Sequence, residues 1–143
     1  MTRTHTITLP ADTRILAELR SFIARNAASD GVDALTLHAL ELAADEIATN
    51  VIEHVASEMP CDIFCRCSID SEQHIAICEI SWQSPKPFRP DIFPETEDIK
   101  QRLESRQPGG LGIFLIHALV DEIEYDYEEG RSLIRVMKKL DSR

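Results

Sequence analysis

The chain has 143 residues, of which 43% are apolar and 28% charged, a balance typical of a soluble globular protein of one domain spanning residues 1–143. A formal net charge of −10, from 25 acidic and 15 basic residues, argues against a nucleic-acid backbone as the main partner. No apolar run reaches membrane length and Met1–Pro10 has no hydrophobic signal core, so we expect no membrane contact and a cytoplasmic location.

The first half of the chain predicts a strand followed by two helices. Alternating polar and β-favouring residues indicate a strand over Arg3–Leu9, which Pro10 ends. Asp12 can cap a first helix, Asn26–Gly31 reads as a connector, and a longer helix follows over about Asp33–Ala56. The apolar residues of the first helix recur at helical spacing: Ile15, Leu16, Leu19, Phe22 and Ile23.

The second half predicts paired strands around a long loop. Five of the seven prolines fall within Gln83–Pro108, and a loop of that length in a compact domain is usually a binding loop or a lid. A short apolar helix over Ile113–Val120 follows it. The predicted strands are Asp62–Ile69 and His74–Trp82, joined by a turn at Asp70–Gln73, and the hairpin Asp121–Tyr127 with Ser132–Lys139 around Glu129-Gly130. These elements predict an α+β fold with helices on one face of a mostly antiparallel sheet.

Four cysteines occur in the chain, three of them close together. Metal sites favour C-x2-C pairs, whereas Cys61, Cys65 and Cys67 have C-x3-C and C-x-C spacing and Cys78 stands alone. On a strand, alternate residues from Cys61 to Ile69 face one way, so we expect a buried sheet face of reduced thiols rather than a zinc site.

Glu46, Asn50 and His54 lie four residues apart in the second predicted helix and therefore share one face. Such a stripe is often a solvated face, yet small and apolar residues surround this one and no lysine or arginine occurs between Arg25 and Arg66. A carboxylate and an amide on a mostly apolar helix need a polar partner, which a metal ion or a bound water would supply.

Three glycines begin the helix after the long loop. Gly109, Gly110 and Gly112 allow backbone N–H groups to approach a phosphate, although a flexible turn has the same composition. The run lacks the Lys and Ser/Thr of a P-loop and lies far from the first strand of a dinucleotide fold, which excludes both of those mechanisms.

In combination, the E-x-x-x-N-x-x-x-H helix, the long loop and the GGLGI run resemble the ATP-binding domain shared by gyrase, the heat-shock chaperones and the histidine kinases. Within that superfamily, the P-F-x-P segment at Pro87–Pro90 and the R-x-P-G-G-L-G-I run at Arg106–Ile113 are similar to the anti-sigma factor serine/threonine-protein kinases. The resemblance covers nearly the whole chain. It implies a Bergerat-type two-layer α/β sandwich, a mostly antiparallel mixed sheet and an ATP lid over about residues 83–108.

The resemblance also implies roles for individual residues. Asn50 matches the asparagine that holds Mg²⁺ against the ATP phosphates, and Glu46 matches the general base that takes a proton from a substrate serine. His54 fits the family pattern but has Val55 after it in place of a small residue. Further ATP contacts are expected from the phosphate-side glycines, the pocket wall and one guanidinium: Gly109, Gly110, Gly112, Leu111, Ile113 and Arg106.

The chain departs from the family where adenine is normally recognised. The usual Asp-x-Gly before the lid is replaced by Gln83-Ser84-Pro85. Gln83 still offers a carbonyl oxygen to the adenine amine, but a neutral amide forgoes a charge-assisted bond, and Pro85 stiffens backbone that usually needs glycine freedom.

Two functions are compatible with these residues. In the first, the protein is an ATP- and Mg²⁺-dependent serine kinase and anti-sigma factor, which phosphorylates an anti-anti-sigma factor of the STAS type and binds a sigma factor. In the second, it is a regulatory binding module with a degenerate adenine site and little or no transfer activity. Family resemblance also makes a homodimer possible.

Overall fold

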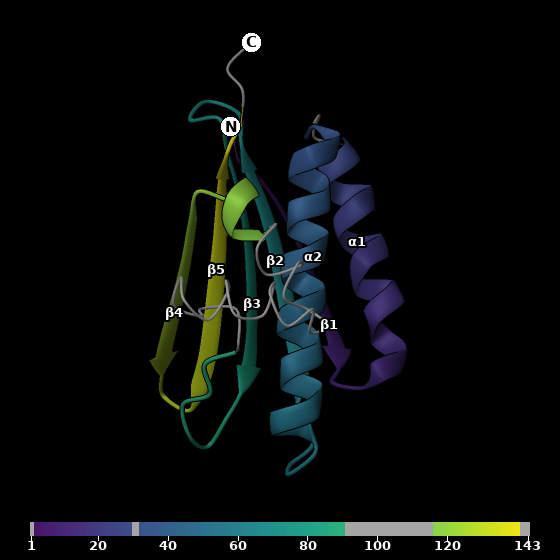
Figure 1. Ribbon diagram of the computed structural model, residues 1–143, viewed down its shortest axis with the longest axis vertical. Helices are drawn as coiled ribbons and strands as arrows, with labels where there is room; N and C mark the ends of the chain where they lie inside the picture. Colours follow the sequence, from purple (N-terminus) through teal and green to yellow (C-terminus); the bar gives the residue numbers. More distant parts are fainter. Residues whose placement is uncertain (1, 30–31, 91–115, 141–143) are drawn as a thin grey trace, which may run out of the picture.

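The computed structural model describes residues 2–29, 32–90 and 116–140 of the chain. Five strands form one sheet in the order β1-β2-β3-β5-β4, and two long helices cover one of its faces (Figure 1). The predicted α+β class with helices on one face is confirmed. The expected mixed sheet is not found, because all four pairings between the described strands are antiparallel. Two helices, rather than one, separate the first two strands, so the chain enters the second strand running against the first.

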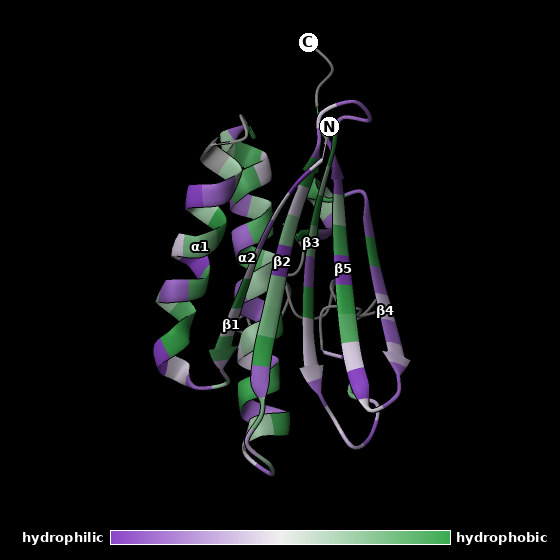
Figure 2. Cartoon of the chain, turned by 180° about the vertical axis from the view of Figure 1, so that it is seen from behind, coloured by the Kyte–Doolittle hydropathy of each residue, from purple (hydrophilic) through white to green (hydrophobic). Residues whose placement is uncertain are grey.

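Successive side chains of each strand point alternately to the face that the helices cover and to an open face. Figure 2 shows the sheet from the open side. Residues that are partners across neighbouring strands are buried together, as are Cys65, Ile80 and Ile134 of β2, β3 and β5. The strands are β1 (Thr2–Pro10), β2 (Asp62–Asp70), β3 (Ile75–Gln83), β4 (Glu122–Glu128) and β5 (Arg131–Lys139).

The first helix begins with a 3₁₀ turn, η1 (Thr13–Ile15), and continues as α1 (Leu16–Ser29). The Asp12 side chain accepts a hydrogen bond from the Arg14 N–H at 2.9 Å, which confirms the predicted cap. The predicted connector from residue 26 starts too early, because the Asn26 amide donates to the Phe22 carbonyl one turn back and Ala27 is buried. None of the described helices is long and apolar enough to cross a membrane.

Helix α2 (Ala34–Val51) carries Glu46 and Asn50 of the predicted polar stripe, and helical structure continues to Ala56, as predicted. Asp33 caps it, with its carboxylate accepting from the Thr36 N–H at 2.8 Å and from the Thr36 hydroxyl at 2.9 Å. The chain then widens into a π-helical turn, η2 (Ile52–Ala56), where the prediction had one continuous α-helix. The buried face of α2 consists of small and aliphatic residues together with one threonine: Thr36, Ala39, Leu40, Ala43, Ala44, Ile47, Ala48 and Val51.

A two-residue turn joins β4 to β5, as predicted. Glu129 and Gly130 both have positive φ, at 51° and 75°, which is the backbone that a tight hairpin requires at its two central positions. The register that follows pairs Tyr127 with Ser132 and Glu128 with Arg131. This turn lies beside the end of β3, since Gln83 pairs with Arg131.

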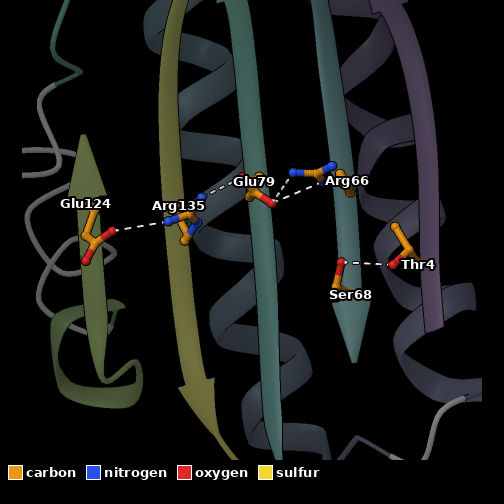
Figure 3. A network of polar contacts seen from close by, with 6 residues as sticks. All are labelled: Thr4, Arg66, Ser68, Glu79, Glu124 and Arg135. Atoms are coloured by element: carbon orange, nitrogen blue, oxygen red, sulfur yellow. Dashed lines mark hydrogen bonds and ion pairs between the residues drawn. The ribbon is translucent and has the colours of Figure 1, made fainter. Parts of the chain in front are cut away.

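The open face of the sheet carries a row of alternating charges (Figure 3). Arg66 donates two hydrogen bonds to Oε1 of Glu79, the shorter of 2.7 Å, and Arg135 donates to Oε2 at 3.2 Å. Arg135 also reaches Glu124 at 3.5 Å. Glu79 is 7% exposed, so two guanidinium groups satisfy a carboxylate that is shielded from water.

We expect Asp33→Ala to lower the free energy of unfolding by about 1 kcal/mol, because it removes the N-cap acceptor of α2. Asp33→Asn should retain most of the stability, since its amide oxygen can still accept. Backbone hydrogen bonding from Thr36 lowers the pKa of Asp33, so the charge contributes above the unfolded-state value of 3.8 and is lost as pH falls through the folded-state pKa. Urea unfolding at pH 7 and pH 3 measures both effects. Equal stabilities for Asp33→Ala and the unmodified chain would contradict the cap.

Glu79→Ala should destabilise the protein by about 2 to 3 kcal/mol, because it leaves two arginines facing each other without their shared carboxylate. Glu124→Ala is the matched control at the exposed end of the same row and should cost less than about 1 kcal/mol. Denaturant unfolding compares the two. A cost for Glu124→Ala as large as that for Glu79→Ala would show that the network does not depend on its buried member.

Candidate functional site

Glu46 and Asn50 lie at the edge of the buried face of α2, where both side chains are half-buried. The Asn50 amide nitrogen donates to the Glu46 backbone carbonyl at 2.7 Å. This bond engages the nitrogen, so the oxygen is the amide atom that can ligate a cation. The carboxylate of Glu46 is one helical turn away on the same side of α2.

His54 departs from this stripe because it lies in the wider π-helical turn. Its side chain is 55% exposed, and its ring lies 5.6 Å from the ring of Phe88, measured between centroids and tilted by 34°. The aromatic contact joins η2 to the segment that follows β3. His54 therefore packs against Phe88 and does not continue the polar pair formed by Glu46 and Asn50.

A pocket of about 140 Å³ opens between η2, with the turn that follows it, and the segment after β3; neither Glu46 nor Asn50 lines it. Residues from both sides line it, with Lys86 and Glu58 supplying opposite charges and Met59, 47% exposed, supplying apolar surface. The full lining is His54, Val55, Glu58, Met59, Ser84, Pro85, Lys86, Pro87 and Phe88. The sequence pointed to part of this wall through the proline-rich segment, but nothing in it indicated Glu58 and Met59.

Ser84 holds the pocket segment against the β4–β5 hairpin. Its N–H donates to the Gly130 carbonyl at 2.9 Å, and its own carbonyl accepts from the Tyr127 hydroxyl at 2.9 Å. The Ser84 hydroxyl donates to the Lys86 carbonyl and closes a tight local turn. Ser84 is 4% exposed, a burial that its polar, proline-flanked sequence does not reveal.

Gln83 does not share this position. It ends β3 and is exposed, and strand alternation puts it on the opposite face from Trp82, which is buried beneath the helices. The structure therefore does not bring Gln83 to the pocket, and Ser84 and Pro85 of the Gln83-Ser84-Pro85 run line it instead. The sequence could not show this, because the face of a strand's last residue depends on the register of the whole strand.

Trp82 has a polar atom that the described residues leave unsatisfied. Its indole Nε1 is buried and has no hydrogen-bond partner within residues 2–29, 32–90 and 116–140. Buried donors of this kind are rare, and the partner is commonly a ligand, a water or another segment of the chain. As the sole tryptophan of the protein, Trp82 is also a natural fluorescent reporter for this end of the sheet.

The phosphate-side residues expected from the sequence lie outside the described residues. This applies to most of the expected lid and to six residues: Arg106, Gly109, Gly110, Leu111, Gly112 and Ile113. On α2, the Asn50 amide oxygen and the Glu46 carboxylate one turn away are donors of the kind that a hard divalent cation accepts.

The chain shares its overall pattern with known proteins. A family model described as the histidine kinase-like ATPase domain matches residues 9–138. The fold is similar to the crystal structure of the RsbU and RsbW domains of Rv1364c from Mycobacterium tuberculosis, with a TM-score of 0.65 at 15% sequence identity. That match covers 96% of this chain and 32% of the other, so this chain spans about a third of that protein. No curated protein matches its sequence.

Tyr127→Phe should loosen the pocket segment, because it removes the hydroxyl that binds the Ser84 carbonyl. We expect faster hydrogen exchange at the Ser84 amide and a loss of about 1 kcal/mol in unfolding free energy. Tyr125→Phe is the control, since the Tyr125 hydroxyl lies 3.1 Å from Ser132 Oγ. Equal acceleration at Ser84 in both variants would contradict a specific anchor.

Proposed function

The chain belongs to the histidine kinase-like ATPase domain family, and from that premise we propose that it binds ATP with Mg²⁺ and transfers the terminal phosphoryl group to a serine of a partner protein. The observation that supports this most directly is the pairing of Glu46 with Asn50 on α2. One turn of helix separates a carboxylate from an amide whose nitrogen is engaged by backbone. That pair supplies a base and a cation ligand side by side.

Glu46 acts as the general base in this proposal. It accepts the proton of the substrate serine hydroxyl as the serine oxygen attacks the terminal phosphorus, and the bond from that phosphorus to the ADP oxygen breaks. The half-buried position of Glu46 leaves it accessible to a docked protein segment. Its place on a rigid helix, rather than on a loop, keeps the base in a fixed direction.

Asn50 would hold the cation through its amide oxygen. Bound Mg²⁺ would neutralise charge on the phosphates. This matters in a chain with a formal net charge of −10, which otherwise repels a nucleotide. Lys86 adds a cation to the wall of the pocket after β3, on the side opposite η2. The glycine run Gly109–Gly112 and Arg106 complete the expected phosphate contacts within this proposal.

The proposed biological role is that of an anti-sigma factor. In this role the protein would act in the cytoplasm, bind a sigma factor and phosphorylate an anti-anti-sigma factor of the STAS type. The support is the R-x-P-G-G-L-G-I run at Arg106–Ile113 and the P-F-x-P segment at Pro87–Pro90, which are similar to those of anti-sigma factor serine kinases. The fold likeness described above supports the architecture and not the partners.

A second candidate is a regulatory binding module that transfers little or no phosphate. The position of Gln83 favours it, because the residue that replaces the adenine-binding aspartate is exposed and lies outside the pocket lining. Pro85 also fixes backbone where the family has glycine. Such a module would keep the partner surface of the fold and lose selective adenine recognition.

Calorimetry with ATP and Mg²⁺ separates the two candidates. For a kinase we expect heat of binding at or below millimolar ATP, with quenching or a shift of Trp82 fluorescence. Asn50→Ala should weaken Mg²⁺-dependent binding by about tenfold to a hundredfold, since a charge-assisted contact is worth about 1.5 to 3 kcal/mol. Absence of binding at millimolar ATP would remove the kinase and leave the binding module.

Asn26→Ala is the matched control for the Asn50 variant. The Asn26 amide also donates to the carbonyl four residues earlier, at 2.8 Å, but on α1. It should therefore show the cost of losing such a bond without any change in ATP affinity. If Asn26→Ala lost as much ATP affinity as Asn50→Ala, the weaker binding of Asn50→Ala would reflect lower protein stability and not a lost cation ligand.

Glu46→Gln tests the base separately from binding. It should bind ATP normally and transfer label from ATP to the anti-anti-sigma protein about a hundredfold more slowly or worse, since a positioned base contributes roughly 10² to 10⁴ in rate. Glu41→Gln, also half-buried on α2, is the control and should transfer at the normal rate. Undiminished transfer by Glu46→Gln would exclude Glu46 as the base.

A further inference from the structure

Three of the four cysteines meet in the core, on the sheet face that the helices cover. Cys65 and Cys67 are alternate residues of β2, and Cys78 of β3 is the direct register partner of Cys67. Their exposed fractions are 0%, 7% and 2%. The predicted buried face of reduced thiols is confirmed for Cys65 and Cys67. However, Cys78, which stood alone in the sequence, completes a cluster of three.

The sulfur atoms have the separation that a metal ion requires. All three Sγ atoms lie within 4.8 Å of one another, and Sγ of Cys65 is 4.0 Å from Sγ of Cys78. With metal–sulfur bonds of about 2.3 Å, three thiolates around one ion lie about 3.8 to 4.0 Å apart. Bringing the sulfurs onto an ion therefore requires side-chain shifts of well under about 1 Å. A single buried cysteine packs as a small apolar side chain, but three sulfurs converging on one point form a donor set.

His5 provides a nitrogen on the same side of the sheet. It is the register partner of Cys67 across β1 and β2, so the two side chains project from the same face. Its Nε2 atom is shielded from solvent.

The geometry points to a zinc site in which Cys65, Cys67 and Cys78 are thiolate ligands. The ring nitrogens of His5 lie outside this group of sulfur atoms, so His5 would become the fourth ligand, through a neutral imidazole nitrogen, by a side-chain shift toward the ion. Binding releases the protons of the coordinating thiols to solvent and leaves a net charge of −1 on a Zn²⁺ ion with three thiolates. All four positions would be filled by protein in a closed, buried environment. Such a site stabilises a fold rather than catalysing a reaction.

This site would join three strands that are distant in sequence. His5 comes from edge strand β1, Cys65 and Cys67 from β2, and Cys78 from β3. The inference does not rest on ATP binding or on the proposed kinase activity, because none of the four residues belongs to α2 or to the pocket after β3. Failure of one proposal leaves the other unaffected.

The test is a Zn²⁺ titration of the reduced, metal-free full chain, with a chromophoric chelator as competitor. We expect one zinc ion per chain, and Co²⁺ used as a probe should give thiolate-to-cobalt charge-transfer absorption. Cys78→Ala should weaken Zn²⁺ binding by more than about a hundredfold, since loss of even an outer-shell partner costs roughly 10- to 100-fold. Cys61→Ala is the control, because Cys61 is a half-buried thiol outside the cluster, and it should bind as tightly as the unmodified chain.

His5→Ala should bind Zn²⁺ about tenfold to a hundredfold more weakly. It should also shift the Co²⁺ spectrum, because the ion loses its nitrogen ligand and keeps only three sulfur ligands from the protein. If a core cysteine variant fails to fold, thermal unfolding of the unmodified reduced chain decides: Zn²⁺ should raise its Tm and a chelator should reverse the rise. No zinc bound to the unmodified chain, no rise in Tm, or full binding by Cys78→Ala would each overturn the proposed site.

Discussion

The candidate site depends on how closely α2 packs against the sheet. Ala39, Ala43, Ala44 and Ala48 are between 0% and 1% exposed, and side chains this small let the helix backbone approach the strands. The buried positions recur every three or four residues, which leaves one rotation of the helix that satisfies them all. That rotation fixes the direction of the polar edge that carries Glu46. The direction of the Glu46 side chain therefore depends on the small side chains of the neighbouring buried face of α2.

The two faces of the sheet differ in how their buried groups are stabilised. The helix-covered face excludes water with aliphatic side chains and thiols, groups that lose little by leaving solvent. The open face instead shields one carboxylate, Glu79, and compensates it with two arginines that remain 44% exposed. A charged central residue on the open face makes close apposition of an apolar partner costly there. The helical face and the loops at its end remain the part of the molecule best suited to ligand binding.

Much of the fold was predictable, because strands, helix caps and the hairpin turn are encoded by neighbouring residues. Asp12 as a cap and Gly130 in the turn are local features, and both are found where the sequence placed them. The face occupied by Gln83 and the meeting of Cys78 with Cys67 were not predictable. Both depend on register between strands, which pairing across the sheet decides. The π-helical turn was also missed, because its sequence continues the pattern of an ordinary helix.

The order of strands has a consequence for how this protein can change. Gln83 of β3 and Arg131 of β5 are register partners, so the chain between them, which includes β4, starts and ends at the same place in the sheet. Closing a loop costs little extra as it grows, about 0.6 kcal/mol for each doubling of its length. The scaffold can therefore accept longer, shorter or rewritten sequence at this one place while α2 and the sheet stay as they are. Because the segment after β3 can change separately from the sheet and α2, ligand preference can change while the fold is retained.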